Sequence, residues 1–320
     1  MTTPRLDPAK LDAVKTLIVH DNCADGTASA ILLQDAFHGR DVKIRFIQYG
    51  TADFQALTPE PGMLFCDFSP PAERAQEFVD AGAIVLDHHK TAKPVVDAFG
   101  DNGVFGDELT APGICGASLA FTHVWLPLCG DMVMHRTFAE RFATLAGIRD
   151  TWQRQDPAWK DACVQANVLH FLPAERWLSR TLMEIAINWD RDFKPIGELL
   201  WDKREKSTQR VCKEALRFQT QKGTRVVVFS GLGETSDAAE AIGSEADLIV
   251  GFLPVCEGGA LKYLFSTRSH TTFDCSALAK ANGGGGHTKA AGFNVNIDMD
   301  STTNPFKFVR ALVEQYEGQF

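Results

Sequence analysis

The chain has 320 residues, enough for about two domains, and its 45% hydrophobic and 23% charged residues are typical of a soluble globular protein rather than a disordered or fibrous one. No run reaches the ~18 apolar residues of a membrane-spanning helix, and the start lacks the apolar block of a secretory signal, so we expect a cytoplasmic protein with no membrane partner. The net charge of −9 argues against a broad basic surface for duplex nucleic acid.

The first half of the chain alternates predicted strands with predicted helices. Apolar runs predict strands at 16–20, 63–67 and 83–87, and an alternating pattern predicts one at 43–49. Helical stretches are predicted at 27–37 and 72–81. Strands separated by such helices indicate a parallel sheet covered on both faces. Helical patterns continue at 116–126 and 137–147, followed by a stretch with four tryptophans, Trp152, Trp159, Trp177 and Trp189.

The second half begins with a long polar helix and continues as another αβ unit. We predict strands at 225–230, 246–254, 261–269 and 292–297, helices at 238–244 and 305–316, and a glycine-rich turn before the last strand. The predicted fold is therefore α/β with two lobes. An N-terminal parallel-sheet domain (1–190) and a smaller C-terminal mixed-sheet domain (223–320) are joined by a helical connector (191–222).

Three predicted strands end in an ionisable residue, His20, Asp67 or Asp87. Ligands of open α/β sheets bind outside the carboxyl ends of the strands, so these side chains are expected to converge. Four segments hold the unusual residues: HDNCADG (20–26), CDFS (66–69), LDHHK (86–90) and GIRDTW (147–152). Mixed carboxylate and imidazole ligands suit ions such as Mn²⁺, and two such ions can clamp a phosphoryl group and activate water. Taken singly, each residue is more often a helix cap or an ordinary core or surface side chain.

In this order the four segments resemble those of the DHH phosphoesterase superfamily. The later GGGGHTKAAGF (283–293) resembles the signature of the DHH-associated C-terminal domain in the RecJ and nano-RNase branch of that superfamily. The matching motifs extend over about residues 16–293, nearly the whole chain. The resemblance implies a catalytic DHH domain followed by a substrate-binding domain.

The resemblance also implies roles for single residues. Two divalent metal ions, most simply Mn²⁺, would be held by His20 and Asp67 and by Asp25, Asp67, His88 and Asp150, with Asp67 common to both. His89 would face the scissile phosphate, and Asp87 would orient a histidine.

One position departs from the family pattern. Cys23 stands where the first motif usually has an aspartate two residues before the Asp-Gly aspartate. Its thiolate could be a direct or near ligand, which would favour Zn²⁺ or Fe²⁺ over Mn²⁺. Alternatively Asp21, Asn22 or a water takes that role, and Cys23 is a small buried residue in a tight turn.

The C-terminal signature is expected to bind phosphate. Gly284, Gly285 and Gly286 allow close backbone approach, so their N–H groups could converge on an anion, and His287 adds a donor. Arg268 on a neighbouring strand could add a bidentate clamp. The resemblance implies that this lobe holds the terminal phosphate or ribose of the substrate and closes on the catalytic lobe. The alternative is a flexible loop. Similar lobes occur in alanyl-tRNA synthetases, so the motif alone indicates RNA-end or phosphate recognition.

Two further features concern charge and thiols. Five basic residues recur at intervals of three and four and predict a stripe on one side of the connector helix: Lys203, Lys206, Arg210, Lys213 and Arg217. The stripe could line the path of an oligonucleotide backbone, or it is a solvated face. The eight cysteines form no CxxC pair, and we interpret them as reduced core thiols, with Cys23 set apart.

The favoured function is a metal-dependent phosphodiesterase, a hydrolase that releases mononucleotides from short single-stranded RNA or DNA like an oligoribonuclease or exonuclease. Within the same chemistry, a 3′-phosphoadenosine 5′-phosphate phosphatase or a phosphodiesterase of linear or cyclic dinucleotides is the alternative. A non-catalytic module that binds nucleotides or RNA ends is an alternative of another class, based on the changed first motif. Inorganic pyrophosphatases of the superfamily lack the glycine-rich signature. Oligomeric state, strand polarity and native metal stay open.

Overall fold

The computed structural model describes residues 6–107, 109–130, 133–257, 260–297 and 304–318. The chain divides into two compact units, 1–201 and 202–320, and each is described by itself. Within the described ranges, no helix combines the length and the apolar character needed to cross a membrane.

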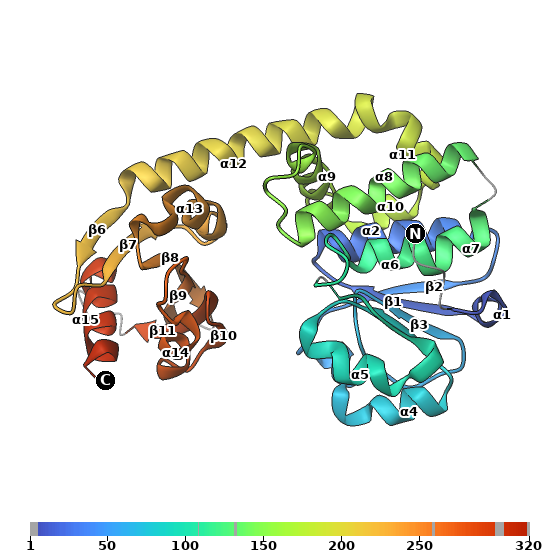
Figure 1. Cartoon of the computed structure of the whole chain (residues 1–320), viewed down its shortest axis with the longest axis horizontal. Coiled ribbons are helices and arrows are strands. Elements are labelled where there is room, and N and C mark those ends of the chain that lie inside the picture. Colours follow the sequence, from blue (N-terminus) through green and yellow to red (C-terminus); the bar gives the residue numbers. More distant parts are fainter. Residues whose placement is uncertain (1–5, 108, 131–132, 258–259, 298–303, 319–320) are drawn as a thin grey trace. The chain divides into compact units, whose positions relative to one another are not determined.

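The first unit is built on a five-stranded parallel sheet (Figure 1). Its strands are β1 (Thr16–His20), β2 (Lys43–Ile47), β3 (Met63–Cys66), β4 (Ile84–Asp87) and β5 (Gly103–Phe105), in the order β2-β1-β3-β4-β5. The four predicted strands are present. The fifth, β5, has three residues, too few for a periodic pattern to reveal. Because β2 and β3 lie on opposite sides of β1, the chain changes winding direction there, and in open α/β sheets ligands bind outside the carboxyl ends of the strands at such a point.

Helices cover both faces of this sheet, as predicted, and the alternation of β1 shows why. Leu17 and Val19 enter one core and Ile18 enters the other, and all three are fully buried. Figure 1 shows α4 (Ala75–Asp80) and α5 (Lys93–Ala98) on one face. The opposite face is covered by α2 (Ala24–Ala36), α6 (Gly116–Ala120) and α8 (Val133–Asp150). Burying each large apolar side chain contributes about 1.5–3 kcal/mol.

The first unit contains further helices, most of them short. They are α1 (Pro8–Leu11), α3 (Ala52–Gln55), α7 (Leu126–Cys129), α9 (Trp159–Phe171), α10 (Ala174–Leu178) and α11 (Leu182–Asn188). Single turns of 3₁₀-helix lie at Ala72–Arg74, Lys90–Ala92 and Gly100–Asn102, and π-helical turns at Phe121–Trp125 and Trp189–Phe193.

Helix boundaries differ from the prediction where the chain approaches the end of the sheet. Helix α2 begins at Ala24, three residues early, so Asp25 belongs to its first turn. Gly26 permits this start, because a Cβ there would lie 2.1 Å from the carbonyl oxygen of His20. Helix α8 extends beyond the predicted 137–147 and ends at Asp150. Both shifts place a carboxylate on a rigid element at the same edge of the sheet.

The second unit has a mixed sheet, as predicted, and this sheet has six strands. Its strands are β6 (Leu216–Gln219), β7 (Arg225–Ser230), β8 (Leu248–Glu257), β9 (Ala260–Arg268), β10 (Gly285–His287) and β11 (Ala290–Ile297), in the order β10-β11-β9-β8-β7-β6. Strands β6 and β10 were not predicted. Among these described strands, β7 and β8 pair in parallel and the other neighbours pair antiparallel. Helices α13 (Thr235–Ile242), α14 (Cys275–Ala281) and α15 (Pro305–Glu317) and the 3₁₀ turn Gly243–Glu245 complete the unit.

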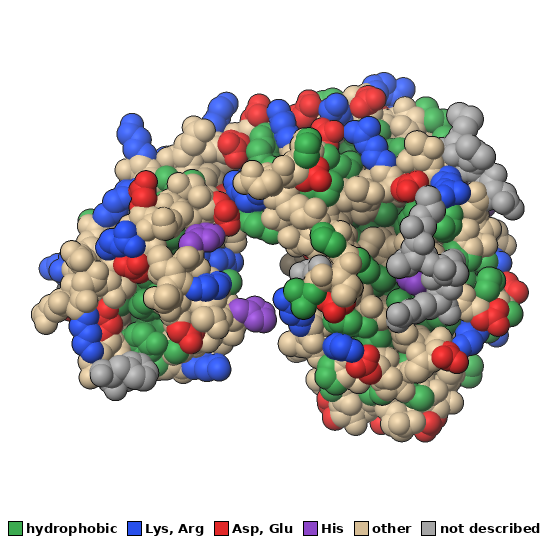
Figure 2. Space-filling view, viewed as in Figure 1, with side chains coloured by type: hydrophobic (Ala, Val, Ile, Leu, Met, Phe, Trp, Pro, Cys, Tyr) green, Lys and Arg blue, Asp and Glu red, His purple; other side chains and the backbone are tan. Residues whose placement is uncertain are grey.

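The predicted helix over 191–222 is shorter than expected and is followed by a strand. Helix α12 spans Lys194–Glu214, and β6 follows, so Arg217 lies on a strand instead of the predicted stripe. Its guanidinium donates to the carbonyls of Cys212 and Ala215, which satisfies acceptors left at the end of the helix. The stripe is therefore reduced to four residues on the helix, Lys203, Lys206, Arg210 and Lys213. In Figure 2 the basic side chains over α12 are interspersed with acidic ones.

The predicted glycine-rich turn is in part a strand. Gly285–His287 form β10, which pairs antiparallel with β11. A Cβ at Gly284 would lie 2.2 Å from the carbonyl oxygen of Gly292, and one at Gly286 would lie 2.6 Å from that of Ala290. These glycines thus allow close backbone approach to the neighbouring strand β11, whereas their predicted approach to an anion stays a prediction.

The eight cysteines are all free thiols. Five of them are buried: Cys66, Cys115, Cys129, Cys163 and Cys275. Cys256 is exposed, so the interpretation as core thiols is wrong for that residue.

Candidate metal centre

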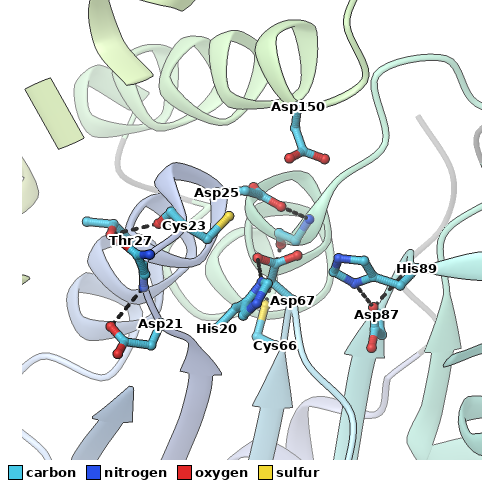
Figure 3. Close-up of polar contacts among 12 residues, drawn as sticks. His20, Asp21, Cys23, Asp25, Thr27, Cys66, Asp67, Asp87, His89 and Asp150 are labelled. Atoms are coloured by element: carbon cyan, nitrogen blue, oxygen red, sulfur yellow. Dashed lines mark hydrogen bonds and ion pairs between the residues drawn. The ribbon is translucent and has the colours of Figure 1, made fainter. Parts of the chain in front are cut away.

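The carboxyl ends of three neighbouring strands bring the predicted side chains together (Figure 3). His20 is the last residue of β1, Asp67 directly follows β3, and Asp87 ends β4 just before His88 and His89. The first turn of α2 adds Asp25, and the last turn of α8 adds Asp150. These residues are far apart in the sequence and meet because parallel strands end at one edge of the sheet.

Two groups of side chains could each hold a metal ion. One consists of His20, Asp67 and His89, and the other of Asp25, His88 and Asp150. Within each group the ligand atoms lie within 4.8 Å of one another. We call these groups the first and the second cluster.

Asp67 connects the two clusters. Its Oδ1 lies 3.1 Å from Nε2 of His88, and its Oδ2 lies 3.5 Å from Nδ1 of His20. The residue is almost fully buried, and its φ of 57° is in the left-handed region, where an aspartate costs on the order of 1–3 kcal/mol. Its N–H donates to the carbonyl of Leu86, which holds this conformation. One carboxylate therefore presents each of its oxygens to a different cluster.

The second cluster concentrates negative charge around His88. Nε2 of His88 lies 3.7 Å from Oδ2 of Asp25 and 3.5 Å from Oδ2 of Asp150. The same atom also contacts Oδ1 of Asp67. Burial opposes the charged imidazole, but these carboxylates outweigh burial and raise the pKa of His88 to about 10. Burial, followed by the charges of Asp67 and Asp150, raises the pKa of Asp25 well above its usual range. A divalent cation would neutralise this buried excess of carboxylates.

The carboxylate of Asp25 is fixed by backbone donors that the sequence did not reveal. The N–H groups of Gly116 and Ala117 donate to its two oxygens over 2.6 and 2.8 Å. A Cβ at Gly116 would lie 2.3 Å from Cβ of Asp67, so only glycine fits between the two carboxylates. Backbone amides carry no side-chain signal, and sequence patterns therefore missed both residues.

Asp87 orients His89, in a geometry that matches its predicted orienting role. Its Oδ1 accepts from the backbone N–H of His89 over 2.9 Å and lies 2.7 Å from Nδ1 of that ring. Its Oδ2 accepts from the hydroxyl of Ser69 over 2.5 Å. Burial opposes protonation of His89, but Asp87 outweighs it and raises the pKa of the imidazole. Because Nδ1 is engaged, the ring presents Nε2 to the site.

Ser69 and Tyr49 support this arrangement and were not predicted. The N–H of Ser69 donates to the hydroxyl of Tyr49 over 2.9 Å. The Tyr49 ring packs on Phe68 with centroids 4.2 Å apart and lies 5.5 Å from the His20 ring. Ser69 stands in the CDFS segment, so its position could have suggested a contact with a neighbouring strand end. Nothing in the sequence marked Tyr49.

The first cluster contains polar atoms that fit a metal ion. Nε2 of His20 lies 3.0 Å from Oε1 of Gln48, which directs Nδ1 toward Asp67. Both Nδ1 of His20 and Oδ2 of Asp67 are buried, and within the described part of the chain neither has a hydrogen-bond partner. Buried polar atoms without partners are rare, and a shared cation would satisfy both.

Cys23 lies outside both clusters. It precedes the first residue of α2, and Figure 3 shows its thiol pointing toward Asp25. Burial and the charges of Asp67 and Asp25 raise the pKa of this thiol. The alternative ligand Asp21 accepts from the backbone N–H of Asn22, and Figure 3 shows its carboxylate turned away from Asp67.

In the second unit, two of the predicted phosphate-binding residues, Arg268 and His287, lie in one row across the sheet. Arg268 and His287 both pair with Ala290, from opposite sides, so their side chains share a face on either side of a small residue. The guanidinium of Arg268 donates to the hydroxyl of Ser236 over 3.1 and 3.2 Å, and His287 is exposed.

Comparisons with known proteins agree with this architecture. No family model matches the chain. Oligoribonuclease NrnB of Bacillus subtilis is 23% identical over 296 residues, which cover 87% of this chain and 72% of that protein. The pGpG-specific phosphodiesterase PggH of Vibrio cholerae has a similar structure, with a TM-score of 0.59 and 14% identity over 95% of this chain and 99% of its own.

Two further solved structures share the fold. The DHH domain of a protein assigned to a family of ribosomal proteins has a TM-score of 0.62 and 14% identity over 97% of this chain and 87% of its own. RecJ of Thermus thermophilus in complex with Mn²⁺ has a TM-score of 0.55 and 19% identity over 98% of this chain, which spans 54% of the RecJ chain. Over nearly its whole length the chain thus shares its fold with DHH-domain proteins, and its sequence is similar to that of the oligoribonuclease NrnB.

Proposed function

We propose that this chain is a metal-dependent phosphodiesterase that releases mononucleotides from short single-stranded oligonucleotides. The observation that carries the proposal is the position of Asp67, whose two oxygens face His20 in one cluster and His88 in the other. The names of the relatives favour short substrates, since NrnB is an oligoribonuclease and PggH is a pGpG-specific phosphodiesterase.

The residues present fit two divalent ions. His20 and Asp67 would hold one ion beside His89, and Asp25, Asp67, His88 and Asp150 would hold the other. When bound, such ions make hydroxide available at neutral pH and neutralise charge on the phosphoryl group. Oxygen and nitrogen ligands suit Mn²⁺, and RecJ of Thermus thermophilus was solved with that ion.

Side chains of both units would position the substrate. Asp87 keeps Nδ1 of His89 occupied, so Nε2 would face the scissile phosphate and, in the protonated ring, would donate a hydrogen bond to it. In the second unit, Arg268 and His287 would bind the terminal phosphate, with Ser236 holding the guanidinium in place. The backbone of Gly284, Gly285 and Gly286 would complete this subsite beside β11.

Hydrolysis of a linear dinucleotide is the second candidate, and the structural similarity to PggH favours it. Both functions use the same metal centre and the same end recognition. The two functions differ in the number of nucleotides that the substrate has beyond the scissile phosphate.

We expect the wild-type protein with Mn²⁺ to release a mononucleotide from a labelled five-nucleotide RNA. His88→Ala and Asp150→Ala should lower the rate by at least about 100-fold, because each removes a ligand atom of the second cluster. Asp53→Ala serves as the control, since this aspartate is exposed on α3 and belongs to neither cluster. Single-turnover product analysis measures all four proteins. If the wild type releases no mononucleotide from RNA, DNA, pGpG or 3′-phosphoadenosine 5′-phosphate, the proposal is wrong and the binding module is favoured.

Cys23 gives a separate prediction about metal content. Because its thiol lies outside both clusters, Cys23→Ala should retain the two metal equivalents of the wild type, whereas His20→Ala should lose one. Metal content after gel filtration in Mn²⁺, measured by mass spectrometry, compares the two variants. Loss of an equivalent from Cys23→Ala would show that the thiol is a ligand.

A further inference from the structure

Beside the metal centre, two tryptophans and two arginines form a compact cluster. The guanidinium carbon of Arg149 lies 4.4 Å from the centroid of the Trp152 ring and 5.5 Å from that of Trp159. Arg154 approaches the same two rings at 5.7 and 5.5 Å, and the rings meet edge to face at 5.3 Å. All four side chains are partly exposed. Neither the metal clusters nor the proposed hydrogen bond from His89 to the phosphate uses them.

The backbone folds this cluster back onto the end of α8. Trp152 has a φ of 58°, which is costly for a bulky aromatic residue, and this turn is closed by the N–H of Gln153 donating to the carbonyl of Ile148 over 2.9 Å. The N–H of Arg154 donates to the carbonyl of Trp152 over 2.9 Å and continues the turn. The turn keeps Trp152 next to Arg149 instead of letting the chain run away from the site.

Core packing accounts for only one member of the cluster. Trp159 packs against a small core formed by Leu145, Ile148 and Ala162. Trp152 does not belong to that core, although it carries the strained backbone and the closest guanidinium contact. A purely structural role therefore explains Trp159 better than it explains Trp152.

We propose that the stacked pair of Trp152 and Arg149 is a platform for the nucleobase next to the scissile phosphate, an inference that rests on the proposed function. The two tryptophans and two arginines lie beside the second metal cluster. Trp152 is two residues from Asp150, so the Cα atoms of these two residues are at most about 7 Å apart. Nucleobases stack on aromatic rings and on guanidinium planes, whatever their sequence. Arg154 adds positive charge for the adjoining phosphate.

Stacking should stabilise the bound substrate and the transition state equally, so its loss should change KM and leave kcat nearly unchanged. Trp152→Ala should raise KM for a short RNA by about tenfold or more and change kcat little. The same variant should lose less than about threefold in kcat/KM for a dinucleotide whose base at the stacking position is replaced by an abasic residue. Trp152→Phe keeps an aromatic face and should recover most of the affinity.

Arg149→Gln tests the second half of the platform and should also raise KM for RNA several-fold. Arg141→Gln is its matched control: it removes the same charge from the same helix, but Arg141 is exposed and paired with Asp161. Thermal melting checks that each variant is folded. If Trp152→Phe and Trp152→Ala both keep the wild-type KM for RNA, the platform is wrong and the phosphodiesterase stands.

A binding measurement separates this inference from the proposed function. A non-hydrolysable phosphorothioate dinucleotide should quench the tryptophan fluorescence of the wild type and much less that of Trp152→Phe. Quenching that depends on Trp152 in a protein without hydrolytic activity would support the platform while rejecting the phosphodiesterase. Equal quenching in both proteins would overturn the platform.

Discussion

Asp67→Asn should abolish turnover, with a fall in kcat of at least about 10³-fold. Loss of a residue that only supports a metal ligand typically lowers metal affinity or activity by ~10–100-fold. Asp67 contacts both clusters directly through its two oxygens, so its loss should have a larger effect. Asparagine has the same size and tolerates the left-handed backbone, so the fold should be kept. Burial opposes ionisation of Asp67, but its contacts with His20 and His88 hold the pKa of this carboxyl below its usual range, so the ionised form stabilises the fold. The metal-free variant should therefore melt below the wild-type temperature.

Asp21→Asn is the matched control for this substitution. It makes the same chemical change beside the site, in a residue whose carboxylate accepts from the N–H of Asn22 and points away from Asp67. Its kcat and metal content should stay within about twofold of the wild type, since asparagine keeps the accepting oxygen. A wild-type rate for Asp67→Asn, or an equal loss in Asp21→Asn, would contradict the bridging role.

Gly116→Ala should impair both stability and activity although it adds a single methyl group. The new Cβ would lie 2.3 Å from Cβ of Asp67 and 2.9 Å from Oδ2 of Asp25, so α6 has to move away from both carboxylates. Overpacking of this kind costs about 1–3 kcal/mol, and the shift also breaks the backbone hydrogen bond to Asp25. We expect a melting temperature several degrees lower and a fall in kcat of roughly 100-fold.

Gly233→Ala is the control for Gly116→Ala. A Cβ at Gly233 would meet nothing within 4 Å, and its backbone is outside the left-handed region. Its effect on the melting temperature should be near zero or slightly positive, because alanine restricts the unfolded chain. Differential scanning calorimetry and the oligonucleotide assay measure both variants. Equal behaviour of the two glycine variants would show that the steric contact at Asp67 is unimportant.

The sequence determined the architecture of the first unit because its strands are short and separated by helices. Alternate residues of β1 enter opposite cores, and apolar runs of this kind were recognised in β1, β3 and β4. Strand β2 is partly exposed and was recognised by its alternating pattern. Prediction failed at the end of α12, where the basic periodicity continued through Arg217 but the chain had already become the edge strand β6. Periodicity records only local spacing, whereas pairing with β7 depends on residues further along the chain.

The strand ends named three residues of the centre, His20, Asp67 and Asp87, because side chains that follow parallel strands meet at one edge of the sheet. The resemblance to the DHH superfamily implied the others. Their pairing could not be derived in this way. That Asp67 turns one oxygen to His20 and the other to His88, and that Asp87 holds His89, depends on the backbone conformation after each strand. The amides of Gly116 and Ala117 and the turn at Trp152 have no side-chain pattern at all, since they arise from close approach of backbones. The sequence by itself thus determined which chemistry is present and on which strands, while the tertiary structure decided which atoms face one another.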